Sequence, residues 1–84
     1  MSLSGKKILI VGGAGFVGSN LAHFILNNYT PKSLYIVDNL LSSEQINIPV
    51  NDAIKFINGS IADDSILDLL PLDLEYVFHL ACYH

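Results

Sequence analysis

The chain has 84 residues, enough for one small domain with one modest hydrophobic core. Apolar residues make up 51% of it and charged residues only 14%, a balance that favours strands buried on both faces over a disordered segment. The net charge of -4 comes from eight acidic residues against four lysines, with no arginine, so there is no basic patch to bind nucleic acid or an anionic membrane.

Cysteine usage and the N-terminal sequence favour a soluble, cytoplasmic protein. Cys82 is the single cysteine, so the chain can form neither an intramolecular disulfide nor a Cys-x-x-Cys metal or redox site. The strongly apolar run near the start covers only Ile8 to Val11, far short of a signal sequence or a membrane span. We therefore expect no membrane partner, and the histidines show no spacing typical of a metal site.

The first part of the chain predicts a βαβ unit. Lys7–Val11 is short, β-branched and followed at once by glycine, which is typical of a central parallel strand that enters a tight turn. From Phe16 onward apolar residues recur at helical spacing as far as residues 27–28, and Pro31 closes this helix. Leu34–Val37 is a second strand that stops at Asp38.

The second part predicts two more strands. Residues 39–52 are polar, contain proline and are expected to form a long loop with at most one helical turn. Ile54–Ile57 is a strand, a short helix capped by Asp63 or Asp64 runs to Leu70, and residues 76–81 form a fourth strand. Right-handed crossovers then predict an α/β fold with a Rossmann-type parallel sheet of order 3-2-1-4, the first half of a doubly wound fold.

Three glycines between the first strand and the first helix form a G-x-x-G-x-x-G motif. Gly12 allows a sharp turn, Gly15 leaves room for a pyrophosphate against the backbone, and Gly18 allows close packing of the helix on the strand. The amides of the first helical turn and the helix dipole then favour phosphate binding. This context predicts dinucleotide binding rather than a tight structural turn.

Asp38 indicates which dinucleotide is bound. It stands 20 residues after Gly18, where a carboxylate can accept hydrogen bonds from the ribose hydroxyls of the adenosine. Its charge would repel a 2′-phosphate, and residues 39–43 supply no basic group to offset it. NAD is therefore the expected cofactor, although the same carboxylate could instead only cap the loop.

These residues together resemble a known family, the extended short-chain dehydrogenases/reductases, which include NAD-dependent nucleotide-sugar epimerases and dehydratases. Gly12 to Leu21 is similar to the family's opening signature, Asp38-Asn39-Leu40 to its second-strand acid and loop, and Phe78 to Ala81 to its fourth-strand segment. The likeness spans nearly the whole chain. It implies cofactor contacts from Gly12, Gly15, Phe16, Val17, Gly18, Asp38, Asn39, Leu40, Ser60, Ile61, Leu80 and Ala81.

The chain departs from the family's pattern in two places. Gly59-Ser60-Ile61 stands where the family usually has Gly-Asp-Ile, which changes the group offered to the adenine. Cys82 replaces an alanine that often follows His-Leu-Ala, and it is expected to pack as a small apolar residue. We interpret His79, in an apolar strand, as structural rather than as a general base.

The family's catalytic Tyr-x-x-x-Lys pair is absent, because none of the four tyrosines has a lysine four residues later. We assign no catalytic residue and expect an N-terminal fragment of the cofactor domain, with the catalytic residues and the nucleotide-sugar domain beyond His84. The resemblance also implies a homodimer. A non-catalytic, redox-sensing dinucleotide-binding module and a flavin-binding unit are the alternatives.

Overall fold

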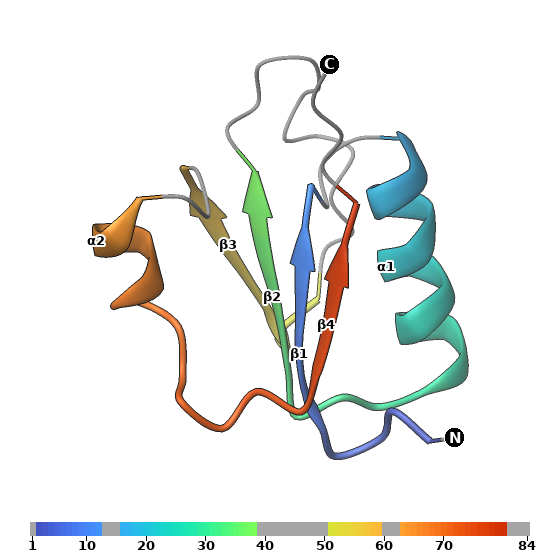
Figure 1. Ribbon diagram of the computed structural model, residues 1–84. Coiled ribbons are helices and arrows are strands. Elements are labelled where there is room, and N and C mark those ends of the chain that lie inside the picture. The colour runs from blue at the N-terminus through green and yellow to red at the C-terminus, as the bar shows by residue number, and fades with distance from the viewer. Residues whose placement is uncertain (1, 13–15, 39–50, 60–62, 81–84) are drawn as a thin grey trace.

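The computed structural model describes residues 2–12, 16–38, 51–59 and 63–80, and the backbone alone for Phe16 and Val17. Its strands form one parallel sheet with a helix on each face (Figure 1). The elements follow the expected sequence strand, helix, strand, strand, helix, strand. They are β1 (Lys7–Val11), α1 (Phe16–Asn28), β2 (Ser33–Asp38), β3 (Ile54–Asn58), α2 (Asp64–Leu67) and β4 (Tyr76–His79).

The strand order β3-β2-β1-β4 confirms the predicted order. Within this sheet β1 pairs with β2 on one side and with β4 on the other, so that Ile10 lies between Ile36 and Phe78. The strands that directly follow β1 in the sequence, β2 and β3, therefore lie on one side of β1, and β4 lies on the other. In doubly wound folds ligands bind where the strand order reverses in this way, at the carboxyl ends of the strands.

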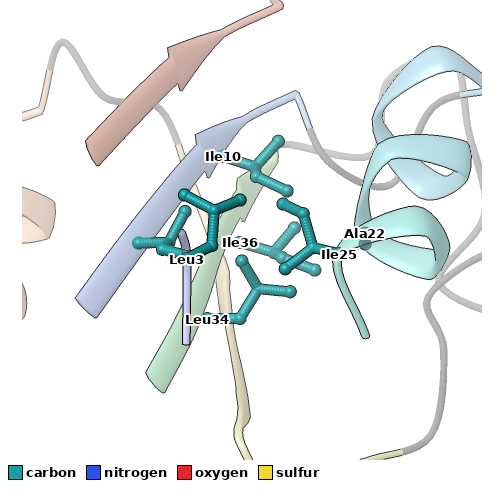
Figure 2. Close-up of a cluster of buried hydrophobic side chains, with 7 residues drawn as sticks. Leu3, Ile10, Ala22, Ile25, Leu34 and Ile36 are labelled. Atoms are coloured by element: carbon teal, nitrogen blue, oxygen red, sulfur yellow. The ribbon is translucent and has the colours of Figure 1, made fainter. Parts of the chain in front are cut away.

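One face of the sheet packs against α1. Ile8 and Ile10 of β1, and Leu34 and Ile36 of β2, are fully buried there. Ala22 and Ile25 of α1 meet them because residues three apart lie on one side of a helix, as Figure 2 shows. Each large aliphatic side chain buried in this way stabilises the fold by about 1.5–3 kcal/mol.

The opposite face packs against α2 through a smaller cluster of Leu9, Val11, Val37 and Ile66. Asp63 caps this helix, since its Oδ1 accepts hydrogen bonds from the amide of Ser65 at 2.9 Å and from the Ser65 hydroxyl at 2.8 Å. These bonds favour the carboxylate and hold the pKa of Asp63 below its ordinary value.

The second helix is shorter than the sequence predicts, because it ends at Leu67 and not at Leu70. The amides of Leu69 and Leu70 donate to carbonyls three residues earlier, at 3.0 and 3.2 Å, in place of the helical partner four residues earlier. Such bonds tighten a last turn. Pro71 then disfavours helical geometry in the residue before it.

The fourth strand is also shorter than predicted and lies at an edge of the sheet. It ends at His79, although Leu80 still donates its amide to the carbonyl of Val11 at 2.9 Å, and residue 81 lies outside the described residues. Val77 is 57% exposed and His79 is exposed as well, so this histidine is not enclosed in the core.

The expected loop over 39–52 falls mostly on residues 39–50, outside the described residues.

Two ion pairs join the start of β1 to the segment that leads into β4. Lys7 Nζ lies 2.9 Å from Asp73 Oδ2, and Lys6 Nζ lies 3.2 Å from Glu75 Oε2. The amide of Glu75 also donates to the carbonyl of Lys7 at 2.9 Å. These contacts fix β4 beside β1 from the amino edge of the sheet.

Neither helix in the described part of the chain is long and apolar enough to cross a membrane.

Candidate functional site

The described site residues predicted from the sequence lie at the carboxyl edge of the sheet. Gly12 directly follows β1, Asp38 is the last residue of β2, and Leu80 directly follows β4. Because all the strands are parallel, these positions share the edge toward which the arrows point in Figure 1. The first turn of α1, which contains Gly18, lies at the same edge.

Gly12 has a backbone conformation that strongly favours glycine. Its φ is 88°, in the region that residues with a Cβ rarely adopt. In this conformation its amide donates to the carbonyl of Val37 with an N to O distance of 2.7 Å. The turn that leaves β1 is thus tied to the end of β2, one residue before Asp38.

The N-terminus of α1 is suited to an anion. The helix begins at Phe16 and carries no acidic side chain in its first turn, so the described residues of that turn leave the positive end of the helix dipole without a carboxylate of their own. Gly18 and Ser19 are buried in this turn, with Ser19 8% exposed. Small residues at these two positions are consistent with the close approach of helix and strand predicted for Gly18.

Asp38 is partly buried, and its carbonyl oxygen accepts a hydrogen bond from the amide of Gly59 at 3.0 Å. The four lysines lie away from Asp38 along the strands. Lys6 and Lys32 precede their strands, Lys7 begins β1, and Lys55 is the second residue of β3. All four therefore lie toward the amino edge, away from the end of β2.

The structure brings Gly12, Gly18, Asp38 and Leu80 to one edge of the sheet. The other predicted contacts fall where side chains or whole residues are not described: Phe16 and Val17 are seen as helical backbone, and Gly15, Asn39, Leu40, Ser60, Ile61 and Ala81 lie outside the described residues. In the described ranges no group of three His, Cys, Asp or Glu side chains could hold a metal ion.

Sequence reasoning did not identify the contact between Gly59 and Ile66. A Cβ added at Gly59 would lie 2.5 Å from Cδ1 and 2.9 Å from Cγ1 of Ile66, closer than non-bonded carbons approach. The signal in the sequence was a glycine directly after a strand, which often marks a close approach by another part of the chain. Its partner on α2 could not be identified without the packing.

The chain is similar in sequence to a family of NAD-dependent enzymes. The model of the NAD dependent epimerase/dehydratase family matches residues 8–84. The dTDP-glucose 4,6-dehydratase of Mycolicibacterium smegmatis is 32% identical over 77 residues, which cover 89% of this chain and 23% of that enzyme.

Two solved structures superpose closely on the chain. The Bordetella bronchiseptica enzyme WbmF, crystallised with NAD+, with NAD+ and UDP, and with NADH, is 48% identical, with a TM-score of 0.88 over 98% of this chain and 24% of that one. An epimerase from Methanothermobacter thermautotrophicus is 41% identical, with a TM-score of 0.86 over 96% of this chain and 24% of that one. The chain thus spans about a quarter of the length of these relatives.

Proposed function

The chain belongs to the NAD dependent epimerase/dehydratase family, and we propose that it supplies the adenosine and pyrophosphate side of an NAD site in a nucleotide-sugar epimerase or dehydratase. One observation carries the proposal. Asp38 ends the strand beside the glycine turn, where a ribose would lie. All four lysines of this chain lie toward the opposite edge, so none of them is placed to bind a 2′-phosphate.

The described residues fit this cofactor. Gly12 makes the sharp turn after β1, the first turn of α1 offers a positive dipole end and carries no carboxylate of its own, and Asp38 offers an acceptor on the neighbouring strand. These groups bind and orient the cofactor, and none of them contributes to the chemical step. Bound NAD would accept a hydride from the sugar and return it.

The relatives of this chain support the proposed class of substrate. The similar enzymes include a dTDP-glucose 4,6-dehydratase, and WbmF was crystallised with UDP. We therefore propose a nucleotide sugar as substrate, with the sugar-binding and catalytic groups in the part of such enzymes that this chain does not span. A cytoplasmic location and a homodimer are part of the same proposal.

Titration calorimetry of the intact protein tests the cofactor assignment. NADH should bind at least about tenfold tighter than NADPH, a difference of about 1.4 kcal/mol, because Asp38 accepts from free ribose hydroxyls and repels a 2′-phosphate. Asp38→Asn should reduce this ratio, whereas the control Asp68→Asn, at an exposed position after α2, should preserve it. Equal affinities in the unsubstituted protein would show that Asp38 does not face the ribose.

A turnover assay tests the enzymatic assignment. Incubation of the intact protein with UDP-glucose and dTDP-glucose, followed by NMR of the sugar, should reveal an epimerised or dehydrated product. Tight NADH binding without turnover of any nucleotide sugar would instead favour the non-catalytic, redox-sensing module.

A further inference from the structure

The end of β2 is held from both sides by glycine amides. Gly12 donates to the carbonyl of Val37 at 2.7 Å from the β1 side, and Gly59 donates to the carbonyl of Asp38 at 3.0 Å from the β3 side. Consecutive carbonyls are therefore fixed by neighbouring strands. The second of these bonds acts directly on the backbone of the residue proposed to select the cofactor.

Because residue 59 has no side chain, Ile66 can pack directly beside this amide. A Cβ there would lie 2.5 Å from Cδ1 and 2.9 Å from Cγ1 of Ile66. Ile66 is 8% exposed and packed among Leu9, Val11 and Val37. Rotation about the outer bond could move Cδ1 but not Cγ1, and the branched Cβ of isoleucine restricts rotation at χ1.

We propose that Gly59 is a positioning residue for Asp38, and so for the selectivity between NADH and NADPH. The inference rests on the proposed function, because it assumes that Asp38 faces the ribose. A side chain at position 59 would push the chain after β3 away from Ile66. The Gly59 amide would then leave the Asp38 carbonyl, and the backbone that carries the Asp38 carboxylate would shift at the edge of the sheet.

The test compares Gly59→Ala, Ile66→Ala and the double variant in the intact protein, with the ratio of NADPH to NADH dissociation constants as the readout. Gly59→Ala should lower this ratio by at least about threefold. Ile66→Ala should weaken folding through lost burial but keep the ratio, because both hydrogen bonds to β2 remain. Gly59→Ala/Ile66→Ala should restore the ratio, because alanine at position 66 has neither of the two carbons that the new Cβ would meet.

Gly5→Ala is the matched control. Gly5 has a φ of 75° with nothing within 4 Å of an added Cβ, and it lies before β1 at the amino edge. The substitution should lower stability through backbone strain and leave the ratio unchanged. If Gly59→Ala does not fold, Gly59→Ala/Ile66→Val, which removes Cδ1 and keeps a γ carbon, replaces it and should give an intermediate ratio.

The possible failures of the two proposals can be told apart. An unsubstituted protein that binds both cofactors equally would overturn the proposed function and this inference with it. An unsubstituted protein that prefers NADH, together with a folded Gly59→Ala variant that keeps the full preference, would overturn only the role of Gly59. If Gly59→Ala loses the preference for NADH and Gly59→Ala/Ile66→Ala does not regain it, the role of Gly59 would also be overturned.

Discussion

The ammonium group of Lys7 contacts both carboxylate oxygens of Asp73, at 3.0 and 2.9 Å, across 66 positions of the sequence. The contact joins the first residue of β1 to the turn before β4. The hydrogen bond to Lys7 lowers the pKa of Asp73 from its ordinary value of 3.8, and the same bond raises the pKa of Lys7 from 10.5. Each shift favours the charged form in the folded state.

The first prediction is a pH-dependent loss of stability in Asp73→Asn. A lowered carboxyl pKa stabilises the fold above 3.8, and this contribution is lost as the pH falls through the folded-state pKa of Asp73. A raised lysine pKa stabilises below 10.5, and this contribution is lost as the pH rises through the folded-state pKa of Lys7. The free energy of unfolding in urea should therefore be slightly lower for Asp73→Asn than for the unsubstituted protein near pH 7. This difference should vanish in strong acid and in strong alkali.

The Asp73 side chain is 68% accessible and that of Lys7 24%, so solvent reaches the pair and the difference at pH 7 should shrink in concentrated salt. A difference that persists at low pH and high salt would assign the effect to packing rather than to charge.

The second prediction separates the two glycines with positive φ. Gly12→Ala and Gly5→Ala place a Cβ at φ values of 88° and 75°, and each should cost about 1–2 kcal/mol of stability. Only Gly12 lies at the proposed cofactor site, where its amide holds the carbonyl of Val37. Denaturant unfolding should show similar losses, whereas calorimetry should show weaker NADH binding for Gly12→Ala alone. Equal binding by both variants would argue against cofactor contact at the glycine turn.

The third prediction compares neighbouring positions on α1. Ile25 is fully buried against the sheet in the cluster that Figure 2 shows, whereas Phe24 is 55% exposed. Ile25→Ala should cost about 2–5 kcal/mol in the free energy of unfolding, because it removes buried carbons and leaves a cavity. Phe24→Ala should change the same quantity by only about 0.5 kcal/mol. A large loss in Phe24→Ala would show that its ring is covered in the intact protein.

Most of the fold could be predicted because its signals are local. β1 spans Lys7–Val11 as expected, and α1 begins at Phe16 and ends at Asn28, where the helical spacing of apolar residues stops. The predicted C-terminal ends of α2 and β4 were wrong. Leu67 ends α2 because the following amides turn to carbonyls three residues back, and apolar periodicity carries no information about that choice of acceptor.

The sequence by itself determined the order of elements, the turn at Gly12 and the acidic end of β2, because hydrophobic period, glycine spacing and charge are properties of a few consecutive residues. Only the tertiary structure decided that Gly12 and Gly59 hold consecutive carbonyls of β2, and that Ile66 fills the space a side chain at Gly59 would need. Those contacts depend on how β3 and α2 pack against the sheet. Close packing is satisfied by the whole arrangement at once, so no single segment encodes it.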